Sequence, residues 1–99
     1  GPDCHVASLF PDQMEIINSK NFCEITGLGP DGHQRLSFTP YFLNQSTETT
    51  FVISGQSKSL AVKNLLSLKY DPQKYPGQAV IQDKNYHLFL DTQAAKLIK

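Results

Sequence analysis

The order of hydrophobic and polar residues in the second half of the chain predicts alternating strands and helices. Residues 49–54 ("TTFVIS") form a short, β-branched run that is typical of a strand buried on both faces. Apolar residues then recur at helical spacing over residues 57–68. Residues 86–91 ("YHLFLD") predict another strand, and Asp91 fits the N-cap of a last helix over residues 92–99. This βαβα order indicates an α/β fold in which helices flank a parallel or mixed sheet.

The first half of the chain is less regular. Residues 6–10 ("VASLF") predict one helical turn, and residues 21–26 predict a strand. A loop rich in glycine over residues 27–34 leads to residues 35–39, where Leu36 and Phe38 alternate with polar neighbours as in a strand. Pro40 fits the first turn of a short helix or a bend that ends near Ser46. Residues 70–78 are expected to form a loop, and residues 79–82 a short strand or extended segment.

Composition narrows the class of protein. The 99 residues allow one domain, and 39% hydrophobic and 18% charged residues are ordinary for a globular protein. Nine basic residues balance nine acidic ones, so no global charge attracts nucleic acid or an anionic membrane. No apolar run is long enough to span a bilayer, and nothing at the start resembles a signal peptide. We expect Cys4 and Cys23 to be reduced thiols of a cytoplasmic protein, with a single disulfide as the alternative.

Two similar stretches place a histidine two residues after an aspartate. They are "GPDCH", which ends at His5, and "GPDGH", which ends at His33. A carboxylate beside a loop histidine can orient the ring or stabilise the imidazolium when the histidine acts as a base. The alternative is a polar surface histidine in a turn. The residues that follow the two stretches differ, so they do not mark a structural repeat.

Two basic residues occupy positions where an anion can bind. Lys58 lies in "SGQSKS", a turn between a predicted strand and a helix that presents backbone N–H groups. The alternative is an ordinary helix start with Ser57 as its cap and Lys58 in solvent. Arg35 opens a strand directly after a loop, where it could grip a phosphate or remain an exposed edge residue. A zinc site is not favoured, because the cysteine and histidine spacings match no common zinc template.

The segment "GPDCHVASLFPD" resembles the "G-x-DGH-T-ASLFP" motif of the 6-phosphogluconolactonase family of the pentose phosphate pathway. Residues 35–66 and 75–98 are similar to later segments of that family, in order and spacing. The resemblance implies a fragment of a Rossmann-like fold of sugar-phosphate isomerases and lactonases. It also implies that residues 1–99 are a single domain, the C-terminal part of a longer lactonase domain.

The family's activity is hydrolysis of 6-phosphoglucono-δ-lactone. By resemblance, His5 matches the catalytic base that activates water, and Asp3 belongs to the same loop. Arg35 and Lys58 match basic positions that contact the substrate phosphate or the oxyanion, whereas His33 matches only a loop. No metal or organic cofactor is implied. The resemblance leaves room for fusion to, or association with, a glucose-6-phosphate dehydrogenase.

Two departures from the family pattern matter. Cys4 stands where the family usually has glycine, which is costly if the residue needs a positive φ. The family's N-terminal half, with its Gly-rich phosphate loop, is missing, so we expect the 99-residue chain alone to be weakly active or inactive. Two alternatives stay open: a non-catalytic sugar-phosphate-binding or interaction module of the same fold, and an enzyme like glucosamine-6-phosphate deaminase.

Overall fold

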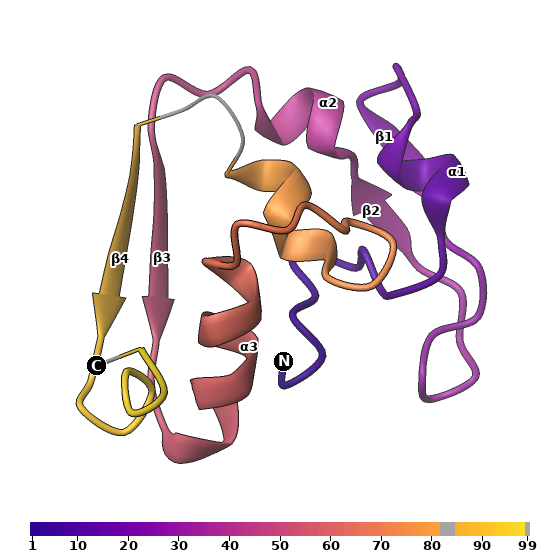
Figure 1. The fold of residues 1–99 in the computed structure, drawn as a ribbon. Helices are drawn as coiled ribbons and strands as arrows, with labels where there is room; N and C mark the ends of the chain where they lie inside the picture. The colour runs from indigo at the N-terminus through magenta and orange to yellow at the C-terminus, as the bar shows by residue number, and fades with distance from the viewer. Residues whose placement is uncertain (82–84, 99) are drawn as a thin grey trace.

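A computed structural model describes residues 1–81 and 85–98 of the chain. Strands alternate with short α-helices and two 3-10 helices, which carry the label η (Figure 1). In chain order the elements are α1 (Met14–Ile17), β1 (Cys23–Ile25), β2 (Leu36–Phe38), α2 (Pro40–Leu43), β3 (Thr49–Ile53), η1 (Gln56–Lys58), α3 (Ser59–Leu65), η2 (Pro76–Val80) and β4 (Tyr86–Leu90).

The strands β3 and β4 form the parallel pair predicted from the sequence. Their register runs from Thr49 opposite Tyr86 to Ile53 opposite Leu90. The chain crosses from one strand to the other through η1, α3 and η2, as a parallel connection requires. Figure 1 shows the two strands side by side, with α3 next to them. The expected α/β class is therefore confirmed.

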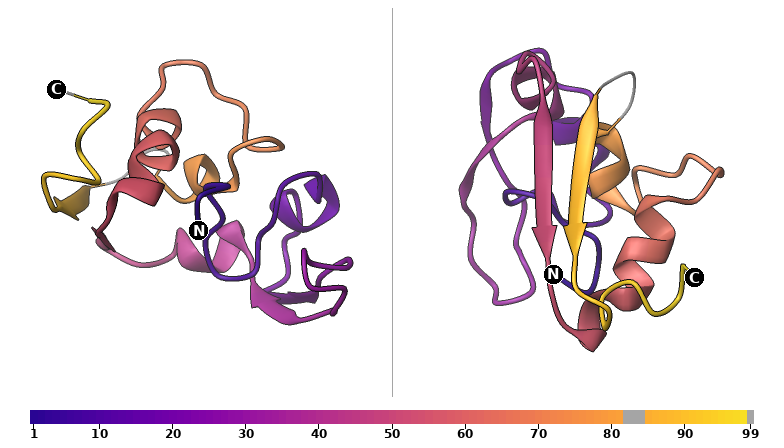
Figure 2. Two further views of the ribbon diagram at one scale, coloured as in Figure 1. Left: turned by 90° about the horizontal axis from the view of Figure 1, so that it is seen from below. Right: turned by 90° about the vertical axis from the view of Figure 1, so that its left-hand side faces the viewer.

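The prediction that β3 is buried on both faces is wrong. Phe51 and Ile53 are half-buried, but Val52 on the opposite face is 81% exposed. In Figure 2 (right) the two strands lie in front, and α3 and the N-terminal half of the chain lie behind them. The described residues thus cover only one face of the pair, and side chains at alternate positions face solvent.

The strands β1 and β2 form a separate antiparallel pair, in which Glu24 lies opposite Ser37. Both strands lie within the predicted ranges, but the side of β2 that faces the interior is the polar one. Ser37 and Thr39 are buried, whereas Leu36 is 72% exposed. The buried hydroxyls bind backbone groups: Ser8 N–H donates to Ser37 Oγ at 3.0 Å, and Thr39 Oγ1 donates to the Asn21 carbonyl at 2.6 Å. These bonds satisfy loop backbone that would otherwise be buried without partners.

Thr39 also explains why α2 begins where it does. Its side chain accepts a hydrogen bond from Phe42 N–H, and Pro40 occupies the first turn, as predicted. The helix α3 begins at Ser59 and ends at Leu65, so it is shorter than the predicted range of residues 57–68. Ser57 does not cap it, because the 3-10 helix η1 occupies the predicted first turn.

Three further segments differ from the prediction. Residues 6–10 form a tight turn, with Ala7 at a φ of 51° and a bridge between Val6 and Leu9, instead of a helical turn. Residues 79 and 80 belong to η2, which Pro76 initiates, rather than to an extended segment; residue 82 lies outside the described residues. Residues 92–98 form successive turns instead of a regular helix, although Asp91 Oδ1 accepts from Ala94 N–H at 2.7 Å as a cap would.

Buried apolar side chains form two clusters, and each cluster contains a residue of the N-terminal segment. One joins Cys4 to Ala61 and Leu65 of α3, and the other joins Leu9, Ile16 and Val80. Figures 1 and 2 place the N-terminus between the β3–β4–α3 unit and the β1–β2 pair. No helix among the described residues has the length and apolar character to cross a membrane.

Candidate active site

The N-terminal loop is a strained turn in which both backbone polar groups of Cys4 form hydrogen bonds. Cys4 N–H donates to the Gly1 carbonyl at 3.1 Å, and the Cys4 carbonyl accepts from Gly77 N–H at 2.9 Å. Cys4 has a φ of 65°, in the left-handed region that favours glycine, so the condition under which a side chain is costly here is met. Among the described residues, the non-glycine positions with positive φ are Cys4, Ala7 and Asp12, all near this loop. Backbone strain of this kind concentrates at functional sites.

His5 and Asp3 form a short hydrogen bond within this loop. Nδ1 of His5 lies 2.6 Å from Oδ1 of Asp3, with the side chains 29% and 34% exposed, respectively. Partial burial acts to raise the pKa of Asp3. The hydrogen bond and the charge of His5 outweigh it, so the pKa lies below the ordinary value of 3.8. Asp3 is therefore ionised near neutral pH, and it fixes the orientation of the imidazole by bonding one of its two nitrogens.

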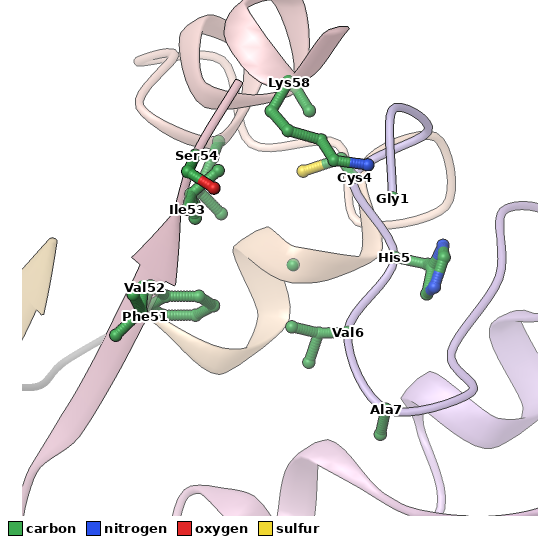
Figure 3. Close-up of a pocket in the computed structure, with 13 residues that line it drawn as sticks. Gly1, Cys4, His5, Val6, Ala7, Phe51, Val52, Ile53, Ser54 and Lys58 are labelled. Atoms are coloured by element: carbon green, nitrogen blue, oxygen red, sulfur yellow. The ribbon is translucent and has the colours of Figure 1, made fainter. Parts of the chain in front are cut away.

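Lys58 reaches the same pocket from the carboxyl end of β3. The pocket has a volume of about 460 Å³, and its lining includes His5, Lys58, Phe51 and Gly77. Figure 3 shows Lys58 extending toward the loop of Gly1 and Cys4, with Phe51 projecting into the space between β3 and that loop. Within the described residues Lys58 forms no salt bridge. Two of the predicted site residues, His5 and Lys58, thus line one pocket, and Figure 3 shows the His5 ring directed away from Lys58.

The turn that carries Lys58 is fixed from the end of β4. Gly55 has a φ of 96°, and its N–H donates to both carboxylate oxygens of Asp91 at 3.1 and 3.0 Å. The sequence predicts Asp91 only as a helix cap and does not predict its hydrogen bonds with Gly55. A carboxylate after a predicted parallel strand, level with a Gly turn after the neighbouring strand, is the signal that could have revealed it.

Arg35 lies beside this pocket and does not line it. Its guanidinium forms an ion pair with Asp31, and it lies over the ring of Phe10 with Cζ 5.4 Å from the ring centroid. Phe10 in turn contacts the ring of His5, with 4.7 Å between the ring centroids. Phe10 was not singled out in the sequence, because an aromatic residue in "VASLF" indicates only a core position.

The second "GPD-x-H" stretch forms an exposed turn. His33 is 77% exposed, and its Nδ1 lies 3.4 Å from Oδ2 of Asp31. His87 is likewise exposed and pairs with Glu48 at 3.0 Å. Both cysteines are free thiols, and burial raises the pKa of Cys4 above its ordinary value of 9.0. Within residues 1–81 and 85–98, no three histidine, cysteine or acidic side chains form a group that could hold a metal ion.

Comparison with known proteins places this chain in a family. The profile described as "Glucosamine-6-phosphate isomerases/6-phosphogluconolactonase" matches residues 1–90. A 6-phosphogluconolactonase of Synechocystis is 31% identical over 99 residues, which is 100% of this chain and 40% of that protein. The 6-phosphogluconolactonase of Aggregatibacter actinomycetemcomitans is 32% identical over 99% of this chain and 42% of its own length.

Solved structures share the fold of this chain. The crystal structure of a protein named devB covers 100% of this chain and 42% of its own chain, with a TM-score of 0.83 and 27% identity. A monomeric glucosamine-6-phosphate deaminase has the same fold, with a TM-score of 0.81 at 20% identity over 98% of this chain and 44% of its own. The chain spans about 40% of the length of the curated relatives that it matches. It belongs to the family of glucosamine-6-phosphate isomerases and 6-phosphogluconolactonases.

Proposed function

We propose that this chain carries the catalytic base and an anion-binding lysine of an enzyme that hydrolyses 6-phosphoglucono-δ-lactone. The observation that carries the proposal is the hydrogen bond of 2.6 Å between His5 Nδ1 and Asp3 Oδ1, in a loop whose His5 shares a pocket with Lys58. The names of the relatives suggest the substrate, and the geometry of the pocket supports the roles that we propose for these residues.

The hydrogen bond between Asp3 and His5 supports His5 as the general base. An ionised carboxylate only accepts hydrogen bonds, so the proton of the imidazole stays on Nδ1 of His5 and Nε2 keeps a free electron pair. Nε2 takes a proton from a water molecule while the water oxygen attacks the lactone carbonyl carbon. The tetrahedral intermediate then collapses, the bond from that carbon to the ring oxygen breaks, and the ring oxygen takes the proton from Nε2. The product is 6-phosphogluconate, and His5 is neutral again.

Lys58 supplies positive charge at the same pocket. Its ammonium group can hold the phosphate of the substrate or stabilise the oxyanion that develops on the carbonyl oxygen. The partly apolar lining excludes some water, which strengthens either interaction. We assign Lys58 this role, and Arg35 stays a predicted contact of the substrate phosphate.

The proposal includes a longer enzyme, of which these 99 residues are the C-terminal part. The matched relatives are much longer than this chain, and β3 and β4 have one uncovered face. We therefore expect the isolated chain to hydrolyse the lactone weakly or not at all. Turnover at the rate of the full natural protein would contradict this expectation.

The decisive variant is His5→Gln in the full natural protein, with His33→Gln as its matched control. His33 sits in the look-alike turn and is exposed, so its loss removes a histidine without touching the pocket. We expect His5→Gln to lower kcat by about 10²- to 10⁴-fold, the usual contribution of a general base. His33→Gln should change kcat less than about twofold, as surface substitutions do. Proton release during lactone hydrolysis measures both, and full activity of His5→Gln would overturn the proposal.

A deaminase is the second candidate, because a glucosamine-6-phosphate deaminase shares the fold. Ammonia release from glucosamine 6-phosphate, without proton release from the lactone, would favour that activity. A binding module without chemistry would show neither, and it would bind sugar phosphates equally well in His5→Gln.

A further inference from the structure

We propose that Asp31 competes with the substrate phosphate for Arg35 and thereby sets the affinity of the enzyme for its anionic substrate, a proposal that rests on the predicted contact of Arg35 with that phosphate. Asp31 belongs to the second "GPD-x-H" stretch, which does not line the pocket of His5. In the structure its carboxylate occupies the guanidinium group that a phosphate would bind. The exposed look-alike turn thus acquires a role in substrate binding.

Asp31 is the ion-pair partner of Arg35 within the described part of the chain. Nη2 of Arg35 donates a hydrogen bond to Oδ2 of Asp31. Oδ1 accepts a hydrogen bond from the backbone N–H of His33 at 3.2 Å, so the turn holds the carboxylate in place. The bonds from His33 and Arg35 hold the pKa of Asp31 below its ordinary value of 3.8, and the carboxylate is therefore ionised near neutral pH. A carboxylate and a phosphate use the same N–H donors of a guanidinium, so both cannot occupy them at once.

The second terminal nitrogen of Arg35 is buried without an acceptor. Nη1 has no hydrogen-bond partner among the described residues. The backbone at Gly29 covers it, since a Cβ built there would lie only 2.5 Å from Nη1. A buried donor without an acceptor is unfavourable, because it has lost its hydrogen bonds to water and gained none. An anion that accepts from both nitrogens removes this cost, which the pair with Asp31 leaves in place.

Gly29 and Asp31 belong to one loop, so a single movement can free both nitrogens of Arg35. Gly29 N–H donates to the His33 carbonyl, and Gly32 N–H donates to the Gly29 carbonyl, both at 2.9 Å. The tip of the loop is therefore held by its own backbone bonds, and residues 31–34 are exposed. When Arg35 exchanges Asp31 for a phosphate, the tip can move away as a unit and keep these bonds.

Arg35 is one aromatic ring away from the candidate base. Its Cζ lies 5.4 Å from the ring centroid of Phe10, and that centroid lies 4.7 Å from the centroid of the His5 ring. Figure 3 shows the His5 ring directed away from Lys58. The Arg35 side chain is 36% exposed, so an anion can approach it from solvent. A phosphate bound to Arg35 would therefore lie beside the loop that carries His5.

The kinetic test compares Asp31→Asn with Glu48→Gln in the full natural protein. Glu48 is a matched control, because it is an exposed carboxylate that pairs with His87 beside the first residue of β3. Asp31→Asn should lower KM for the lactone about two- to fivefold, the effect of losing an exposed ion pair, with kcat within about twofold. Glu48→Gln should change neither constant. A raised KM in Asp31→Asn would mean that Asp31 orients Arg35 for the substrate, and it would overturn the proposal, as would an unchanged KM.

Loss of any negative charge near an anionic site can strengthen binding, so a second pair of variants isolates the role of Arg35. Arg35→Met removes the phosphate contact and should raise KM about tenfold or more. Asp31→Asn should then have no further effect on KM, since the two residues act through one ion pair. An equal fall of KM in both backgrounds would assign the effect to charge alone and contradict the proposal, as would an unchanged KM in Arg35→Met.

A titration with inorganic phosphate needs no catalysis. In protein isotopically labelled at its arginines, the NMR signal of the Arg35 Nε–H, assigned by its absence in Arg35→Met, should shift as phosphate is added. The midpoint should be about two- to fivefold lower in Asp31→Asn than in the wild type, and unchanged in Glu48→Gln. Equal midpoints in Asp31→Asn and the wild type, or a signal that phosphate does not move, would overturn the proposal. If the midpoint falls but no lactone is hydrolysed, the competition stands and the proposed function fails.

Discussion

Removal of the Asp91 carboxylate should loosen the turn that carries Lys58. Asp91 accepts hydrogen bonds from Gly55 N–H and from Ala94 N–H, so Asp91→Ala deletes the contacts that join two neighbouring loops. Loss of a helix-type cap costs about 1 kcal/mol. Loss of the bond to Gly55 costs about 1 kcal/mol more, because that bond is charge-assisted but exposed to solvent. Asp91→Ala should therefore destabilise this region by about 2 kcal/mol.

Native-state hydrogen exchange measures this effect locally. A loss of about 1 kcal/mol at each contact speeds exchange of the Gly55 and Ala94 amides by about fivefold. Asp91→Asn keeps one acceptor oxygen and should give a smaller increase. The amide of Thr26, which bonds to the Arg35 carbonyl in the distant β1–β2 pair, serves as the internal control.

The same variant links the turn to the site. If Lys58 binds substrate through this turn, Asp91→Ala should raise KM for the lactone more than it lowers kcat. Unchanged exchange of the Gly55 amide in Asp91→Ala would refute the reasoning, because it would mean that the two hydrogen bonds do not hold the turn.

Two further predictions concern the N-terminal loop. The pKa of Asp3 is lowered in the folded state, so its bond to His5 contributes stability above the ordinary pKa of 3.8, and this contribution disappears as the pH falls through the folded value. The difference in unfolding free energy between the wild type and Asp3→Asn should therefore shrink below pH 3.8, and a difference that stays constant in acid would contradict the pairing. Gly77→Ala places a Cβ 3.1 Å from the Cys4 carbonyl oxygen and 3.3 Å from its sulfur. We expect a loss of about 1–3 kcal/mol in a urea titration, and unchanged stability would show that the loop moves freely.

The sequence predicted the parallel unit well because its signals are local. The β-branched run of β3, the helical spacing of α3 and the aromatic run of β4 each identify one element, and the order of the elements requires a parallel connection. The sidedness of β2 was not predictable in this way. Alternation predicts which residues share a face, but Ser37 and Thr39 face inward because loop backbone needs their hydroxyls, and that need arises only in the folded chain.

In the candidate site, too, local contacts were predictable from the sequence and contacts between distant residues were not. The contact of Asp3 with His5 spans two residues, so a short motif could predict it. Lys58 was placed correctly at the end of a parallel strand, where ligand sites gather. The contacts of Phe10 with Arg35 and of Gly55 with Asp91 join residues that are distant in sequence, and no periodicity of side chains encodes them.

The hydrogen bonds between Gly55 and Asp91 also affect the order in which the two loops of the site can form during synthesis. The two residues are 36 positions apart, and closing a loop of that size costs chain entropy that only the completed β3–β4 pair can offset. The turn bearing His5 is complete once Gly77, whose N–H donates to the Cys4 carbonyl, has been added to the chain. The turn that carries Lys58 lacks these hydrogen bonds until the chain has been synthesised past Asp91. A nascent chain halted before that point would carry Lys58 on a turn that lacks its hydrogen bonds to Asp91.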